Sequence, residues 1–109
     1  MTRFELRYRT AALADLEEIF RAVLRVSANP IVARRYVERI RARCRRIALL
    51  PQGGRPRDDL APGLRSVPFE HRAVIVYRVL GDVVEVTNVF HGGRDYSVLY
   101  RRGVTDQDE

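Results

Sequence analysis

Apolar and charged residues alternate at the start of the chain. Phe4, Leu6 and Tyr8 are separated by single charged residues. A period of two with one apolar face predicts a short β-strand. From residue 11 to about residue 28 the apolar positions recur in steps of three and four, which predicts an amphipathic helix. Its stripe comprises Ala12, Leu13, Leu16, Ile19, Phe20, Val23 and Leu24.

Asn29 and Pro30 interrupt this helical pattern. Asparagine suits the position that caps a helix, and proline suits the first helical position after it. The sequence therefore predicts a second helix from Pro30 to Leu50 and a helical hairpin. We expect the arginines of the second helix to lie opposite its apolar stripe, which comprises Ala33, Tyr36, Val37, Ile40, Cys44 and Ile47.

Strand patterns dominate the second half of the chain. Pro51 and the glycines after it end the helix, and residues 64–69 are a possible strand in which Pro68 requires an edge or a bulge. Residues 72–80 and 83–90 are the strongest strand candidates, with a two-residue turn between them. The element order β-α-α-β-β-β predicts an α+β fold with the helical hairpin on one face of a mainly antiparallel sheet.

The length of 109 residues predicts one domain, residues 1–109, in which residues 104–109 form a frayed tail. The longest apolar run is far shorter than the roughly 20 residues that span a bilayer, so no membrane partner is expected. The charged N-terminal residues resemble no secretory signal, and the lone cysteine permits no internal disulfide. These features favour a cytoplasmic protein.

Positive charge is concentrated in one segment. The chain has 20 basic residues, all arginine, and a net charge of +6. Between residues 31 and 50 a single acid, Glu38, accompanies seven arginines, so this segment alone carries the excess and is expected to meet an acidic partner. The seven are Arg34, Arg35, Arg39, Arg41, Arg43, Arg45 and Arg46.

Three motifs on this element order carry a family resemblance. They are Pro51–Arg65 (PQGGRPRDDLAPGLR), Val74–Val79 (VIVYRV) and His91–Asp95 (HGGRD). With this layout, residues 4–100 resemble the RelE/ParE superfamily of toxins from bacterial type II toxin–antitoxin systems, some of which serve plasmid stabilisation. The resemblance implies a small toxin that a co-expressed antitoxin holds inactive. ParE-type members poison DNA gyrase, whereas RelE-type members cut mRNA in the ribosome.

The chemistry of the side chains favours the ParE branch. Metal-free RNA cleavage needs a base, an acid and cations that stabilise the phosphorane. Arginine supplies only the cation well, because its pKa stays above about 12. The closely spaced lysines that the RelE branch carries on its second strand are missing, since the chain has no lysine. The HGGRD motif also resembles the ParE branch, where no cleavage chemistry is attributed to it.

Gyrase inhibition and RNA cleavage would use different residues of the chain. As a gyrase inhibitor the chain would need no catalytic set, and Arg55, Arg57, Arg65 and Arg94 would contact the target or another polyanion. As a ribosome-dependent endoribonuclease it would use Arg65, His91, Arg94 and Tyr100, with Tyr100 or His91 carrying the proton and the basic helix docking on the ribosome.

A third alternative is a basic nucleic-acid-binding module without toxicity. No Cys/His set has zinc spacing and no phosphate-binding glycine motif is present, so neither a metal nor a cofactor is expected. The simplest interpretation of His91 is a histidine at the end of a strand. The simplest interpretation of Cys44 is a core residue.

Overall fold

A computed structural model describes residues 3–92, 96, 99 and 100; Arg94 and the 104–109 tail lie outside this part of the chain. Strand β1 (Glu5–Tyr8) leads into helices α1 (Thr10–Ser27) and α2 (Pro30–Leu49), followed by a short 3-10 turn, η1 (Pro51–Gly53). The sheet continues with β2 (Arg55–Pro56), β3 (Arg65–Phe69), β4 (Ala73–Leu80) and β5 (Val83–His91).

The five strands form one mixed sheet in the order β1-β5-β4-β3-β2. Strand β1 pairs parallel with β5, and the other pairs are antiparallel. The mainly antiparallel α+β prediction is therefore confirmed, and the Gly81–Asp82 turn joins β4 to β5 as expected. Pro68 pairs with Val74 of β4, and among the described residues no strand pairs with it on its other side, because β2 pairs only with Arg65 and Ser66.

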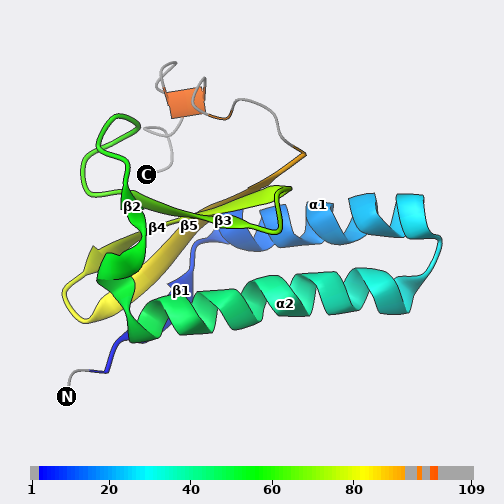
Figure 1. The fold of residues 1–109 in the computed structure, drawn as a ribbon, viewed down its shortest axis with the longest axis horizontal. Coiled ribbons are helices and arrows are strands. Elements are labelled where there is room, and N and C mark those ends of the chain that lie inside the picture. Colours follow the sequence, from blue (N-terminus) through cyan, green and yellow to red (C-terminus); the bar gives the residue numbers. More distant parts are fainter. Residues whose placement is uncertain (1–2, 93–95, 97–98, 101–109) are drawn as a thin grey trace.

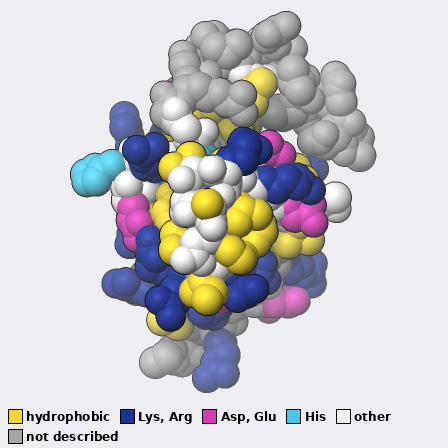
Figure 2. Space-filling model, turned by 90° about the vertical axis from the view of Figure 1, so that its right-hand side faces the viewer, with side chains coloured by type: hydrophobic (Ala, Val, Ile, Leu, Met, Phe, Trp, Pro, Cys, Tyr) yellow, Lys and Arg dark blue, Asp and Glu magenta, His cyan; other side chains and the backbone are white. Residues whose placement is uncertain are grey.

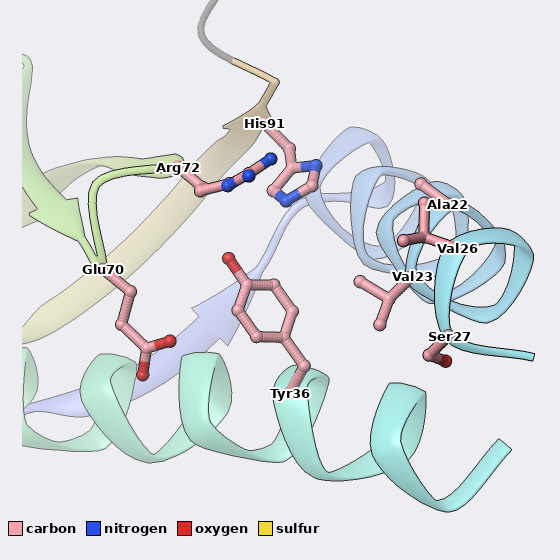
Figure 3. Close-up of a pocket in the computed structure, with 8 residues that line it drawn as sticks. All are labelled: Ala22, Val23, Val26, Ser27, Tyr36, Glu70, Arg72 and His91. Atoms are coloured by element: carbon pink, nitrogen blue, oxygen red, sulfur yellow. The ribbon is translucent and has the colours of Figure 1, made fainter. Parts of the chain in front are cut away.

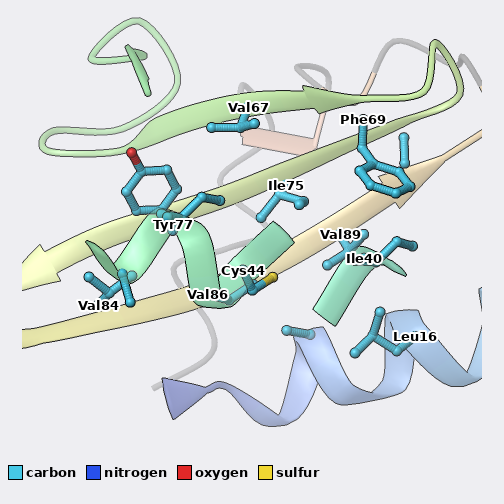
Figure 4. Packing of buried hydrophobic residues seen from close by; sticks show 14 of the residues in the cluster. Leu16, Ile40, Cys44, Val67, Phe69, Ile75, Tyr77, Val84, Val86 and Val89 are labelled. Atoms are coloured by element: carbon cyan, nitrogen blue, oxygen red, sulfur yellow. The ribbon is translucent and has the colours of Figure 1, made fainter. Parts of the chain in front are cut away.

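The helical hairpin covers one face of the sheet, as Figure 1 shows. The core between them includes Leu16 and Ile40 from the helices and Ile75, Tyr77 and Val86 from the strands, all buried (Figure 4). Alternate strand residues point into this core, and a register shift between β4 and β5 allows both Val86 and Val89 to do so. The opposite sheet face carries Phe90, against which Tyr96 and Tyr100 pack.

The break between the helices forms as the sequence predicts. The Asn29 side chain accepts a hydrogen bond of 2.9 Å from the Ile31 backbone N–H, and Pro30 is the first residue of α2. Ala28 ends α1 in the left-handed conformation, with φ of 55°. Cys44 is fully buried in the core, as expected from its place in the apolar stripe.

The strand β2 and the turn η1 were not predicted from the pattern. Both depend on Tyr77, whose buried hydroxyl donates to the Pro51 carbonyl at 2.7 Å and accepts from the Gly54 N–H at 3.0 Å. A Cβ atom at Gly54 would collide with this hydroxyl. A distant strand residue therefore positions the segment that follows α2. Neither described helix is long and apolar enough to cross a membrane.

Candidate target-binding surfaces

The first candidate surface lies on the sheet face opposite the helices and is built around Arg57. The Arg57 guanidinium pairs with Asp59 at 2.9 Å and donates to the Tyr96 hydroxyl at 3.0 Å. The Tyr96 ring stacks on Phe90 of β5, with 4.5 Å between centroids and 6° between planes. The hydrogen bonds to Asp59 and Tyr96 raise the pKa of Arg57, which remains a fixed cation. We call Arg57, Phe90, Tyr96 and Tyr100 the aromatic–arginine cluster.

Tyr100 joins this cluster through the edge of its ring. The ring lies T-shaped against Phe90 with 6.3 Å between centroids, and the Tyr100 hydroxyl donates to Asn88 Oδ1 at 3.4 Å. Burial raises the pKa of Tyr100 to about 12, with a further contribution from Tyr96 and the Asp15 carboxylate. At neutral pH the hydroxyl therefore stays protonated and is a poor general base.

Asp15 of α1 connects the helix to this end of β5. Its carboxylate accepts from the Val89 backbone N–H at 2.8 Å and from the Asn88 side chain at 3.4 Å. Pairing between β1 and β5 ends at Val86, so the carboxylate satisfies an N–H that β1 does not reach. The same bond holds Asn88 in position beneath Tyr100.

Arg65 lies on the other face of the sheet. It pairs across the sheet with Tyr77, whose ring is in the core, and directly paired residues point to the same face. Its guanidinium donates to the carbonyls of Gly54 at 2.7 Å and of Gln52 at 3.1 Å, and to Gln52 Oε1 at 2.8 Å. This arginine holds the turn after α2 to the sheet.

His91 also lies on the helix side. Its ring packs edge-on against Tyr36 of α2, with 5.7 Å between centroids. Burial and the neighbouring Arg72 cation lower the pKa of His91, so the imidazole is neutral at pH 7. The two rings line a pocket of about 380 Å³ between the sheet end and the hairpin (Figure 3). Its other lining residues are Ala22, Val23, Val26, Ser27, Glu70 and Arg72.

The three described members of the proposed ribonuclease set therefore do not contact one another. Arg65 bonds to the turn after α2 and His91 packs on Tyr36, both on the helix side, whereas Tyr100 packs on Phe90 of the opposite face. Arg94, the fourth member, lies outside the described residues. Of the expected polyanion contacts, Arg57 is in the aromatic–arginine cluster and Arg55 is exposed on β2.

The arginines of α2 form a second candidate surface. Arg34, Arg35, Arg39, Arg45 and Arg46 are exposed, as predicted. The prediction is wrong for Arg41 and Arg43, which are half-buried at the flanks of the apolar stripe. Arg41 lies over the Tyr8 ring, 4.8 Å from its centroid. Arg39 forms two 2.9 Å hydrogen bonds to Glu70 and so joins α2 to the β3–β4 turn.

Several residues of the first surface were not predicted from the sequence. Asp15, Asn88, Phe90 and Tyr96 all contribute contacts there. The sequence could have placed Asn88 and Phe90 on one sheet face, since alternate residues near the end of a strand face the same side. The partnership of Asp15 with β5 has no local signal, because 74 positions separate its carboxylate from the Val89 N–H.

A comparison with known families decides the classification. Residues 6–96 match the sequence profile described as "ParE toxin of type II toxin-antitoxin system, parDE". The chain belongs to the ParE toxin family. This membership implies an antitoxin as partner. No curated protein matches the chain significantly.

Two solved structures share the fold of this ParE-family chain. A chain from the "Chromosomal ParDE TA system from P. aeruginosa" superposes with a TM-score of 0.72 and 22% identity, covering 83% of this chain and 97% of that chain. A free double arginine-to-alanine mutant of the E. coli toxin RelE gives a TM-score of 0.61 and 19% identity, covering 98% and 99%. Both similarities concern the fold alone. In the described part of the chain no three His, Cys, Asp or Glu side chains gather where they could hold a metal ion.

Proposed function

We propose that this ParE-family toxin inhibits DNA gyrase by binding it and stabilising its DNA-cleaved state, and that a cognate antitoxin neutralises it. Such an inhibitor needs complementary surfaces and no acid–base set. The proposal places target contact on the aromatic–arginine cluster, together with Arg55 and Arg94.

One observation carries the binding mechanism over a cleavage mechanism. The two groups offered as proton carriers, His91 and Tyr100, lie on opposite faces of the sheet. Tyr100 has a pKa of about 12 because of burial, and Arg57 beside it is a permanent cation. This cluster can hold an anion, whereas neither Tyr100 nor Arg57 is suited to accept a proton at neutral pH.

Gyrase supercoiling with the purified chain tests the proposal. We expect micromolar toxin to inhibit supercoiling and to increase the amount of linear plasmid released by detergent and protease. Arg57→Ala should weaken this effect at least tenfold. Arg21→Ala, which removes an exposed arginine on α1, should retain it. Full gyrase activity in the presence of a micromolar excess of toxin would remove the support for this target.

The pocket lined by His91 and Tyr36 supports an antitoxin-binding site on this part of the surface. Apolar side chains of α1 line one wall, and Val26 is 89% exposed beside it. Figure 2 looks onto the tip of the hairpin and shows apolar side chains with arginines around them. An amphipathic, partly acidic C-terminal segment of the antitoxin would fit such a surface by folding on binding.

Co-expression tests this arrangement. The antitoxin without its C-terminal segment should fail to protect cells, and Val26→Glu in the toxin should weaken protection by the intact antitoxin. Because Val26 is largely exposed, the substitution should leave gyrase inhibition unchanged. Neutralisation by the truncated antitoxin would contradict the arrangement.

Ribosome-dependent mRNA cleavage is the second candidate. The observation that favours it is the position of Tyr100 and Arg57 on one face. Cleavage would have to use Tyr100 without His91. Loss of mRNA cleavage on Tyr100→Phe in a translating extract would support this candidate.

A further inference from the structure

The outer surface of α2 carries two rows of side chains that share an unusual charge pattern. Successive residues of an α-helix are about 100° apart, so positions 34, 38, 41 and 45 form one row and positions 35, 39, 42 and 46 the next. Six of these eight residues are arginine; the exceptions are Glu38 and Ala42. The rows therefore form a nearly continuous basic surface along three turns.

The arginines at the two ends of the rows differ from those in the middle. Arg39 is held by Glu70, and Arg41 lies on the Tyr8 ring. Arg34, Arg35, Arg45 and Arg46 are exposed, and no ion pair joins any of them to a residue in the described part of the chain. These four guanidinium groups are the available cations of the surface.

The spacing of these four arginines follows from helix geometry. Eleven residues separate each member of the first pair from its counterpart in the second, which is about 16 Å along the axis. Eleven residues also return to within about 20° of the same direction. The two pairs thus point the same way, at a separation comparable with a DNA major groove about 12 Å wide plus its bordering phosphates.

We propose that Arg34, Arg35, Arg45 and Arg46 form a surface that binds the phosphate backbone of duplex DNA. A guanidinium fork matches phosphate oxygens and can donate to two of them. The helix α2 would lie across the major groove, with Arg34 and Arg35 on the phosphates of one border and Arg45 and Arg46 on those of the other. A-form RNA is a poorer match, since its major groove is deep and narrow.

An acidic protein is a less suitable occupant. Stable protein interfaces place apolar or aromatic anchors at their centre and charges at the rim. Here the arrangement is reversed, because the exposed large apolar residues of α2 are Ile31, Val32 and Leu49, at its ends. Between residues 34 and 46 the surface offers charge without an anchor.

DNA binding by α2 goes beyond the binding of gyrase. Its biological role rests on the proposed function, in which gyrase holds DNA beside the toxin. Direct DNA binding can be measured without gyrase. The two ideas therefore fail separately, one in a binding assay and the other in a supercoiling assay.

Fluorescence anisotropy of a labelled 20-base-pair duplex, titrated with the full chain at 50 mM salt, is the test. We expect micromolar or weaker binding that is independent of sequence. Four phosphate contacts give a slope of about −3.6 for log K against log salt, or roughly a 100-fold loss between 50 and 200 mM. Arg45→Ala combined with Arg46→Ala should weaken binding at least tenfold and reduce the slope by about 2.

The control removes the same charge from α1. Arg21→Ala combined with Arg25→Ala lowers the net charge equally at two exposed positions and should change binding less than threefold. The salt slope of the unchanged chain remains informative if a variant folds poorly. Absence of binding at 50 mM salt, equal losses in both double variants, tighter binding of duplex RNA, or displacement by polyglutamate at equal charge would each overturn the inference.

Discussion

Two tyrosines differ in what their hydroxyl groups contact. Tyr77 donates to the Pro51 carbonyl and accepts from the Gly54 N–H, both within the buried part of the structure. The Tyr36 hydroxyl is also buried, but it has no hydrogen-bond partner among the described residues. Tyr77 alternates with Ile75 and Val79 along β4, a pattern that is typical of a core residue. Its second role as the anchor of the turn after α2 depends on a contact across 26 positions, which no local pattern indicates.

Removing each hydroxyl should therefore have a different effect. We expect Tyr77→Phe to lower the free energy of unfolding by about 1–3 kcal/mol, since it leaves a buried N–H and a carbonyl unpaired. Tyr36→Phe removes a hydroxyl that is buried without a partner and should be neutral or slightly stabilising. Urea unfolding of the two variants measures the difference. Equal losses would contradict the contacts assigned to Tyr77.

His91 should make stability depend on pH in the acidic range. Burial and Arg72 lower its pKa from the usual value near 6.5, so folding favours the neutral ring. This contribution is complete above pH 6.5 and is lost as pH falls through the lowered pKa. His91→Gln should therefore lose less stability than the wild type between pH 7.5 and 5.

Urea unfolding at the two pH values measures this effect. His71→Gln removes the other histidine, which is exposed, and serves as the control that should keep the wild-type profile. A wild-type profile in the His91 variant would show that the ring is not stabilised in its neutral form.

The elements follow from local pattern wherever period and turn chemistry agree. Both helices, the three longer strands and the turn at Gly81 were predicted, because each has a consistent apolar period or a residue suited to positive φ. The parallel pairing of β1 with β5 could not be read from either strand, since period two does not specify a neighbour. The conformation of the β3–β4 turn could not be predicted from the sequence either. It places Glu70 and His71 at φ of 49° and 63° although neither is glycine.

Removing a glycine from one hairpin turn and introducing one into the other should change stability in opposite directions. Gly81 has φ of 61°, so Gly81→Ala should destabilise the fold by about 1 kcal/mol. His71→Gly relieves a left-handed residue at the price of a more flexible unfolded chain, and we expect a gain of up to about 1 kcal/mol. Thermal or urea unfolding gives the sign of each change. Destabilisation by both substitutions would mean that His71 contributes a contact beyond its backbone conformation.

The whole molecule separates its chemistry between two faces. The sequence correctly indicated membership in a toxin family, which the match over residues 6–96 confirms. It could not indicate that Arg65 and His91 lie on the helix side while Tyr100 lies on the opposite face, because that depends on strand register. Grouping these residues by their spacing in the chain joined side chains that the sheet keeps apart.

The central claim is that this molecule acts by holding its target and breaks no bond in RNA. Primer extension on mRNA from a translating extract supplied with the pure chain tests it most directly. We expect no new 5′ ends, with the wild type and Tyr100→Phe giving the same pattern as buffer alone. Cuts that appear with the wild type and disappear with Tyr100→Phe would contradict the claim.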